Sequence, residues 1–445
     1  PPAPQIDGYQ FNGWVGQFSN VTSDRTIQAT YKEIPAIVET IERVEGDLKV
    51  IEHGRFTFEI PINALMPGFS LPQNIFQTIT AWPIPELEGM TFSGWQLEDE
   101  IIPNGYQITS NDDFELKGIF IPEGFIYEFK GNSTHIDGYD GNSNTIDIPG
   151  YIHNRPVESI YFDNSNSPIN YDAVSQVNIP NTVKIIEDLA FQGFGNLSTL
   201  NIPIDSKLEF IGGSSFQNVS SLKTLYIPRY VDTLPNTFGP MRGLETINVD
   251  SNNANFQSID GVLYSKDLSV LMNYPSAKPD VTYEMPSGVE STILYGGLNY
   301  NSYLEEIVIP ASFKTFESGS ISVLDNLKSI EVHPDNAFFS SLEGVLFNKE
   351  VTELIKYPAN NMTAFYGLPD TVEIIHEDAF DGARFLTEIL IQPTSQLKRI
   401  EDFALTRTSS LEKLFLPKTF EHMGRRVFYR SGIEAFEVAT DNPYF

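Results

Sequence analysis

The residues of this chain best suited to acid–base or metal chemistry are its histidines and its many carboxylates. The six histidines are His53, His135, His153, His333, His376 and His422. No two of them have the HExxH or i, i+4 spacing that sets two imidazoles on one helix face around zinc. Glycosidase chemistry needs two carboxylates facing across a cleft, and among 59 Asp and Glu, neighbours such as Glu98 and Glu100 arise by chance. These residue types predict no catalytic residues and no metal site.

Short motifs that bind nucleotides or carry a nucleophile are also missing from the sequence. The chain has no GxSxG, GxxxxGK[ST] or GxGxxG segment. The acidic segment that begins at Asp140 suggests a calcium loop, but its sixth and twelfth positions are Thr145 and Tyr151, where an EF-hand needs Gly and Glu. We therefore expect a protein that is not an enzyme and uses no cofactor.

The composition excludes several further classes of function. The 445 residues include 28 Lys and Arg against 59 Asp and Glu, and a net charge of −31 repels nucleic-acid phosphates and anionic lipid headgroups. No apolar run reaches the ~18 residues of a membrane span, so we expect no membrane insertion in this fragment. Cysteine is absent, which excludes disulfides and thiolate sites, so burial must stabilise the fold.

One phrase recurs through most of the chain and organises it. It consists of Leu, two variable residues, Leu or Ile, one variable residue and an aliphatic residue, often followed by Pro. Copies begin at Leu197, Leu222, Leu244, Leu304, Leu327, Leu386, Leu411 and Ile433, and a shortened copy ends at Pro180. Several neighbouring copies lie 22–25 residues apart, within the roughly 20–29 residues of leucine-rich repeats. This period predicts a solenoid of short repeats.

A longer period of 82 residues lies on top of the short one. It separates Leu222, Leu304 and Leu386. Each long block contains the same insertion, at residues 253–275 and 336–358. Both copies predict a β-hairpin whose first strand starts at Gly261 or Gly344, followed by a charged turn and a second apolar strand that ends at Tyr-Pro.

The alternation within each phrase predicts a short strand with one buried face. In the copy that begins at Leu222, we expect Leu225 and Ile227 to face the core and Lys223 and Thr224 to face outward. A single repeat cannot bury its own apolar face, so the stack is the stable unit. The outward positions should form a ladder on the concave side, and exposed apolar members favour partner binding unless a capping module or the hairpins cover them. The central outward positions hold Asn201, Tyr226, Asn248, Val308, Glu331, Leu390, Phe415 and Glu437.

The segments that follow the strands resemble a known family. Residues 183–196 and 372–385 both run through an aliphatic residue and Ile to Ala-Phe, at Ala190-Phe191 and Ala379-Phe380. Over about 123–445 the chain resembles the BspA-type leucine-rich repeat proteins of bacterial surfaces. Three other copies depart from the pattern, with Ser215, Thr237 and Val427 in place of the Ala. The resemblance implies a mainly β, right-handed superhelical solenoid with β-hairpin insertions.

The N-terminal third has a different pattern. Two segments share Gly-x-x-Phe-x-Gly-Trp, ending at Trp14 and Trp95, and each then runs through a polar turn into an alternating strand. This resembles the Listeria–Bacteroides repeat, a small β-grasp-like module of internalin-type surface proteins. We expect a partial module at 1–32, a second module at 33–122 and a solenoid at 123–445, with both chain ends falling in mid-pattern as in a fragment of a longer protein.

The resemblance implies an extracellular or bacterial cell-surface setting. We expect an adhesin-like protein that recognises an extracellular or host protein through the solenoid, with the N-terminal modules as spacers. Carbohydrate binding, with Trp14, Trp95 or ladder aromatics as stacking platforms, is the alternative, and a purely architectural spacer is another.

Overall fold

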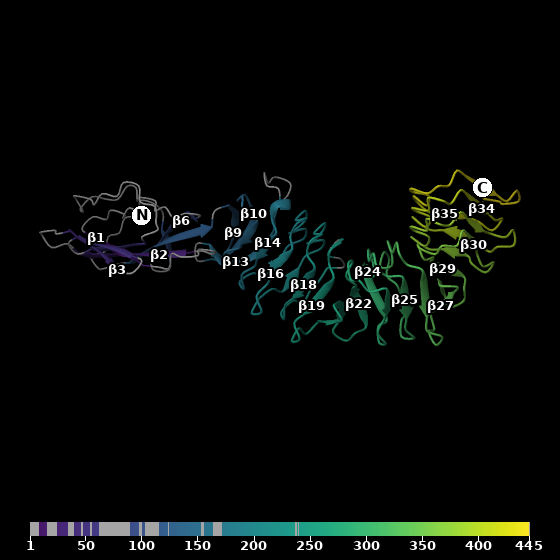
Figure 1. Cartoon of the computed structure of the whole chain (residues 1–445), viewed down its shortest axis with the longest axis horizontal. Helices are drawn as coiled ribbons and strands as arrows, with labels where there is room; N and C mark the ends of the chain where they lie inside the picture. The colour runs from purple at the N-terminus through teal and green to yellow at the C-terminus, as the bar shows by residue number, and fades with distance from the viewer. Residues whose placement is uncertain are drawn as a thin grey trace. The chain divides into compact units, whose positions relative to one another are not determined.

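In a computed structural model the chain divides into two compact units. One unit comprises Pro1–Ala190 with Thr199–Leu208, and the other comprises Phe191–Ser198 with Glu209–Phe445. The structure describes backbone strands between residues 9 and 122 and, with side chains, residues 124–152, 155–162, 171–235, 238 and 240–444. Across this described part the repeats form a β-solenoid of about 13 turns distributed over both units (Figure 1), which confirms the predicted mainly β solenoid.

The N-terminal third forms two sheets. One is an antiparallel sheet in the order β1-β2-β8-β6-β7, and the other is the meander β3-β4-β5. The strands are β1 (Tyr9–Val15), β2 (Arg25–Glu33), β3 (Thr40–Glu45), β4 (Leu48–His53), β5 (Phe56–Pro61), β6 (Met90–Leu97), β7 (Glu100–Ile102) and β8 (Glu115–Pro122).

The two Gly-x-x-Phe-x-Gly-Trp segments correspond to β1 and β6. The register shifts between Phe11 and Gly13 where β1 pairs with β2, and between Phe92 and Gly94 where β6 pairs with β8. The shared bulge gives the sequence similarity a backbone counterpart. The side chains of Trp14 and Trp95 lie outside the described residues, and the predicted modules remain predictions.

The solenoid turns of the first unit have two strand ladders. Their strands are β9 (Phe125–Lys130), β10 (Ser133–Tyr139), β13 (Arg155–Ile160) and β15 (Ile185–Ile186) on one side, and β11 (Thr145–Asp147), β14 (Gln176–Asn178) and β16 (Thr199–Asn201) on the other. The short strand β12 (Tyr151–Ile152) pairs with β13, and η1 (Tyr171–Ala173) is a single 3-10 turn.

In the second unit the repeated phrase forms a parallel ladder in three sections, which we call the phrase ladder. Its strands are β18 (Thr224–Ile227) and β19 (Thr246–Val249); β23 (Thr282–Glu284), β25 (Glu306–Ile309) and β26 (Ser329–Val332); and β30 (Phe365–Gly367), β32 (Glu388–Leu390), β34 (Lys413–Leu416) and β36 (Ala435–Val438). Further short strands lie in the chain after phrase strands, and we call them the return strands. They are β17 (Phe210–Ile211), β24 (Ser291–Gly297), β31 (Ile374–Ile375), β33 (Arg399–Ile400) and β35 (His422–Met423).

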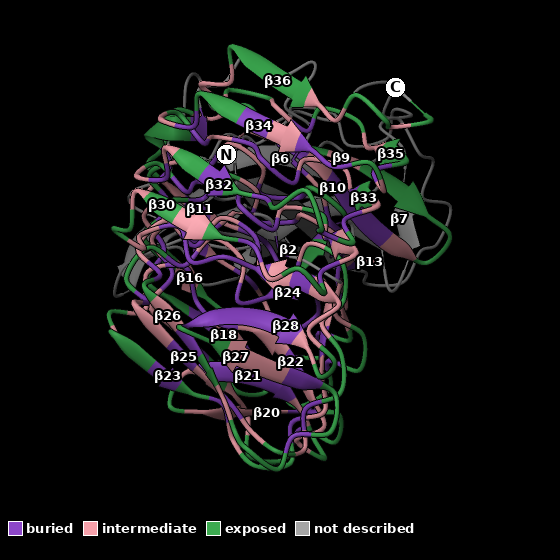
Figure 2. Cartoon of the chain, turned by 90° about the vertical axis from the view of Figure 1, so that its right-hand side faces the viewer, coloured by how far each residue is buried: buried purple, intermediate pink, exposed green. Residues whose placement is uncertain are grey.

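The predicted inward and outward positions of the phrase are confirmed. Leu225 and Ile227 are 0% exposed, whereas Lys223 and Thr224 lie on the surface. Burying one such aliphatic side chain contributes roughly 1.5–3 kcal/mol, so each added turn stabilises its neighbours. Aromatic residues of the segments that follow the phrase strands are buried too, and the rings of Phe191 and Phe216 stack with centroids 5.4 Å apart. In Figure 2 the strand β28 (Val345–Asn348) is mainly buried, whereas β36, the last strand of the phrase ladder, is mainly exposed.

The insertions are three-stranded meanders, one strand longer than the predicted hairpins. They consist of β20 (Phe256–Ile259), β21 (Val262–Ser265) and β22 (Val270–Asn273), and of β27 (Phe339–Leu342), β28 (Val345–Asn348) and β29 (Glu353–Lys356). The hairpin prediction omitted the first strand of each because only half of its side chains are apolar. The third strand pairs in parallel with a return strand, β22 with β24 and β29 with β31, so each meander becomes part of the stack.

Tight turns bring the meanders against the phrase ladder. Asp260 and Gly261 have φ of 49° and 79°, and Glu343 and Gly344 have φ of 51° and 79°, the double positive φ of a type I′ turn. A Cβ on Gly344 would lie 2.9 Å from the Cβ of Ser329, and the carbonyl of Gly344 accepts from Ile330 N–H at 2.8 Å. Glycine is therefore required both by φ and by the approach to β26.

Buried asparagines join successive turns. Asn336 is 0% exposed, and its amide nitrogen donates to the carbonyls of Pro310 and Phe313 at 2.8 and 2.9 Å. Its amide oxygen accepts from the N–H groups of Phe338 and Phe339, both at 2.8 Å. Equivalent bonds from the amide nitrogen to two carbonyls of the preceding turn recur at Asn253, Asn301 and Asn442.

Candidate functional site

The structure places all eight predicted ladder residues at outward positions of phrase strands. Asn201 lies on β16 in the first unit, and the other seven lie in the second unit. Asn201, Asn248, Glu331, Leu390 and Glu437 are exposed, whereas Tyr226, Val308 and Phe415 are half-buried. We expected a continuous row of outward residues, and the structure interrupts it. The phrase strands belong to separate sheets, and a meander stands in the chain between successive sections of the phrase ladder.

The side chains of two of these residues form hydrogen bonds with neighbouring side chains. Asn201 donates to Asn178 at 2.6 Å, and Asn178 donates in turn to Asp147. The hydroxyl of Tyr226 donates to Asp250 at 3.0 Å, and burial, aided by this carboxylate, raises the pKa of Tyr226 to about 12. These polar side chains therefore satisfy one another along the sheet.

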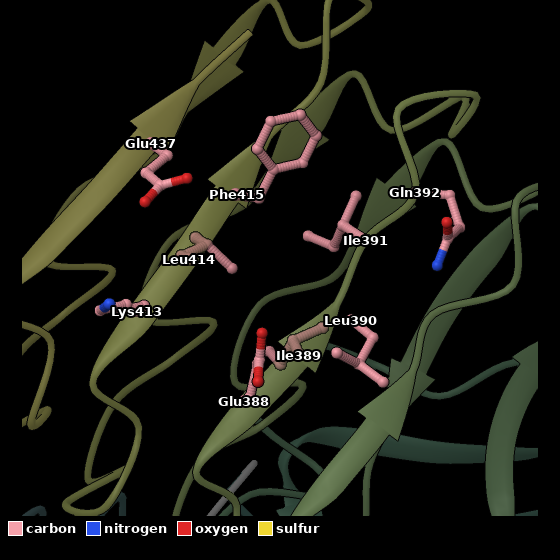
Figure 3. A pocket seen from close by; sticks show the side chains of 9 residues that line it. All are labelled: Glu388, Ile389, Leu390, Ile391, Gln392, Lys413, Leu414, Phe415 and Glu437. Atoms are coloured by element: carbon pink, nitrogen blue, oxygen red, sulfur yellow. The ribbon is translucent and has the colours of Figure 1, made fainter.

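Leu390 and Phe415 are brought together at a hollow on the outward face of β32, β34 and β36. The hollow has a volume of about 260 Å³, and Figure 3 shows its side chains. Its lining consists of Glu388, Ile389, Leu390, Ile391, Gln392, Lys413, Leu414, Phe415 and Glu437. Of these, Ile389, Ile391 and Leu414 are buried core residues that form an apolar floor.

The hollow forms because the ladder opens between two strands. β32 and β34 share one register pair, Glu388 with Lys413, whereas β34 and β36 share four. At three other pairs of neighbouring phrase strands, the residue directly after the second strand donates its backbone N–H to a carbonyl of the first strand at 2.9 Å. These bonds run from Asp250 to Ile227, from His333 to Ile309 and from Ala439 to Leu416. The residue at this place after β34 is Pro417, which has no N–H to donate to Ile391. β32 and β34 therefore lack this backbone bond.

Charged side chains surround the apolar floor. Glu388, Lys413 and Glu437 are all exposed at outward positions. Phe365 on β30 is 59% exposed and lies in register with Glu388 on β32. It adds apolar surface beside the hollow. The prediction from sequence included Glu437 but missed Glu388 and Lys413, although the same alternation around Ile389 and Leu414 marks them as outward.

A second polar group lies around His135 in the first unit. Glu128, His135 and Asp137 hold potential metal-ligand atoms within 4.8 Å of one another. His135 is buried, which lowers its pKa; its Nε2 lies 3.2 Å from Asp137 and its Nδ1 is hydrogen-bonded to Ser159. Lys130 lies 2.8 Å from Glu128. Both imidazole nitrogens and the carboxylate of Glu128 thus contact polar groups of the protein itself. We assign no ligand to this group.

An ionic cluster inside the second unit joins turns that are far apart in sequence. Arg407 donates to Asp381 at 2.8 and 2.6 Å and to Asp325, 82 residues away, at 2.8 Å. Burial acts to raise the pKa of Asp381, but the bonds from Arg407 and the charge of Lys356 outweigh it and hold that pKa below its usual value. Burial lowers the pKa of Lys356, which donates to the backbone carbonyl of Asp378 at 2.8 Å. Because these groups are mutually paired, the cluster is structural.

No helix among the described residues is long and apolar enough to cross a bilayer. No curated protein matches the chain. Among solved structures, the chain is similar to the pneumococcal vaccine antigen PcpA, with 19% identity, coverage of 72% of this chain and 81% of that chain, and a TM-score of 0.41.

Two further solved structures are similar to the chain. A leucine-rich repeat protein from Eubacterium ventriosum is 17% identical over 71% of this chain and 70% of that one, with a TM-score of 0.37. A leucine-rich cell surface protein from Faecalibacterium prausnitzii is 20% identical over 71% and 93%, with a TM-score of 0.30.

The sequence itself matches a family model. The model for the BspA type leucine-rich repeat region matches in six copies, over residues 142–264 and 335–444, which together make up just over half of the chain. The register of the strands and the buried phrase residues agree with this match. The chain belongs to the BspA-type leucine-rich repeat family.

Proposed function

We propose that this chain is a non-enzymatic binding protein of the bacterial cell surface or its surroundings that recognises a protein partner through the hollow on β32, β34 and β36. The family is typically surface-associated and its repeat architecture generally binds proteins, which supports the setting and the class of partner. The observation that carries the proposal is a hollow between two strands of a hydrogen-bonded sheet, beside exposed Leu390 and half-buried Phe415.

The size of the hollow favours a protein partner over a free small molecule. Sites for small ligands usually enclose roughly 300–1,000 Å³. A hollow of about 260 Å³ that is partly open to solvent suits one apolar side chain projecting from a larger surface. An anchor side chain in a central pocket, surrounded by a polar rim, is the usual source of most binding energy at protein interfaces.

The geometry also keeps the cost of binding low. The floor residues belong to strands whose backbones are held by register pairs on both sides of the gap, β30 with β32 and β34 with β36. Ordering side chains at an interface costs about 0.5–1.5 kcal/mol for each flexible group. Because the strands that carry Leu390 and Phe415 are already paired, binding orders these side chains but needs no ordering of the backbone.

A binding screen with matched variants tests this proposal. Purified extracellular matrix proteins would be measured against the immobilised chain by biolayer interferometry, and each hit measured again with Phe415→Ala and with Leu390→Asn. We expect at least tenfold weaker binding for Phe415→Ala, because truncating a central anchor costs about 2 kcal/mol or more.

The control is Tyr230→Ala combined with Phe338→Ala, which removes two exposed rings, 54% and 48% accessible, that do not line the hollow. We expect less than a twofold change from this control. Hits that bind Phe415→Ala and Leu390→Asn as tightly as the parent chain would refute recognition through the hollow.

A further inference from the structure

Resting on the proposed function, we propose that the partner segment held by the hollow is cationic, with one bulky apolar side chain flanked by Lys or Arg. The outward positions of the phrase ladder from β23 to β36 carry one Lys and five Glu. The Lys is Lys413, and the five acids are Glu284, Glu306, Glu331, Glu388 and Glu437. This face is therefore acidic as well as apolar.

The acids beside the hollow lack the cation that some other glutamates of the described solenoid have. Two glutamates one position before a phrase strand pair with a lysine of a neighbouring turn, Glu245 with Lys223 at 2.9 Å and Glu305 with Lys328 at 2.8 Å. Within the described residues, neither Glu388 nor Glu437 forms an ion pair. Their charges are left to attract a group from outside the chain.

Charge complementarity selects among the possible occupants. A second copy of this chain would bring a further net charge of −31 towards an acidic rim, and an anionic glycan would be repelled in the same way. A basic segment gains attraction that steers its approach and fixes its register. The apolar floor then holds the central side chain.

The positions of the acids suggest how the segment lies. Figure 3 shows Glu437 and Glu388 on opposite sides of the floor, on β36 and β32. The two strands lie two spacings of about 4.8 Å apart, and the acids are also offset by two residues of about 3.3 Å, because Glu437 is in register with Phe415 and Glu388 with Lys413. The separation is therefore at least roughly 12 Å, which an extended chain covers in about four residues. Basic residues one or two positions before and after the apolar anchor would reach both carboxylates.

Four amidated synthetic nonapeptides test the inference by isothermal titration calorimetry against the full chain. All four are otherwise built from serine. Three have a central leucine, and the residues that flank it are lysine in the first, serine in the second and glutamate in the third. The fourth has the lysine flanks but a central glycine. We expect the lysine-flanked leucine peptide to bind at least fivefold tighter than the serine one, and the glutamate and glycine peptides to bind most weakly.

The variant Glu388→Gln with Glu437→Gln should remove that preference, reducing affinity for the lysine-flanked leucine peptide three- to tenfold at low salt. The control, Glu350→Gln with Glu421→Gln, makes the same change in net charge at two exposed acids away from the hollow and should change affinity less than twofold. About 0.5 M salt should erase the difference, since it screens exposed charges.

Failure of the inference and failure of the proposed function give different results. If all three leucine peptides bind alike and Phe415→Ala or Leu390→Asn weakens each, the hollow binds but the cationic preference is wrong. If the two glutamine pairs weaken binding equally, the attraction comes from the whole acidic surface and the inference is overturned. If Phe415→Ala and Leu390→Asn change no affinity, recognition through the hollow fails as well.

Discussion

Replacing Asn336 by alanine tests how the solenoid turns are joined. The change leaves the carbonyls of Pro310 and Phe313 and the N–H groups of Phe338 and Phe339 without their amide partner, at a site that is 0% exposed. Each orphaned buried group costs about 1–3 kcal/mol. The bonds to Phe313 and Phe339 are buried, whereas water can reach those to Pro310 and Phe338, so we expect Asn336→Ala to lose about 2–4 kcal/mol of unfolding free energy.

Asn442 offers a matched control for this prediction. Its amide donates to the carbonyls of Pro417 and Phe420 at 2.9 and 3.0 Å, the same arrangement, but the residue is only half-buried. Water can replace an exposed partner at little cost, so Asn442→Ala should lose about 1 kcal/mol. Urea denaturation followed by circular dichroism gives both values. Equal losses at the two positions, or a loss at Asn336 below about 1 kcal/mol, would refute the reasoning.

The variant Asn336→Asp adds a pH test of the same bonds. The new carboxylate would still accept from Phe338 and Phe339, but its second oxygen would face two carbonyl oxygens instead of donating to them. This repulsion should raise the folded pKa of the introduced acid above its unfolded value of about 3.9. The variant should therefore be least stable at neutral pH and recover relative to the parent chain as pH falls through the folded pKa. No recovery would contradict the assigned bond directions.

Three further predictions concern other parts of the second unit. Asp381→Asn, which removes the 4%-exposed partner of Arg407, should lose about 3–5 kcal/mol in urea denaturation; because the folded pKa of Asp381 is lowered, its contribution is present above the unfolded pKa and lost as acid brings pH through the folded value. Gly344→Ala should lose at least 1–2 kcal/mol through its φ of 79°, whereas Gly367→Ala, with open space around it, should leave the thermal midpoint unchanged. Tyr226→Phe should leave the ultraviolet titration of tyrosinate unchanged up to about pH 11, because burial raises the pKa of Tyr226 to about 12; an earlier difference would show that this hydroxyl is open to water.

Local pattern was enough to predict the phrase ladder. The inward positions, such as Leu225 and Ile227, follow from strict alternation, because successive side chains of a strand point to opposite faces. The stacking of copies follows from a period that no single repeat can bury alone. The meanders were predicted in part: the second and third strands and the charged turn between them were expected, whereas the first strand of each and the turn at Gly261 or Gly344 were missed.

The solenoid, the outward positions of Leu390 and Phe415 and the acidic charge of the chain all follow from the amino-acid sequence. Which of those positions meet depends on how the turns stack. The opening between β32 and β34 depends on pairing between residues 25 positions apart, Glu388 and Lys413, and the cluster of Arg407 with Asp325 depends on residues 82 positions apart. Alternation fixes which face a side chain occupies, but the distance between two turns depends on the backbone bonds between them, and those bonds are made only when the turns stack.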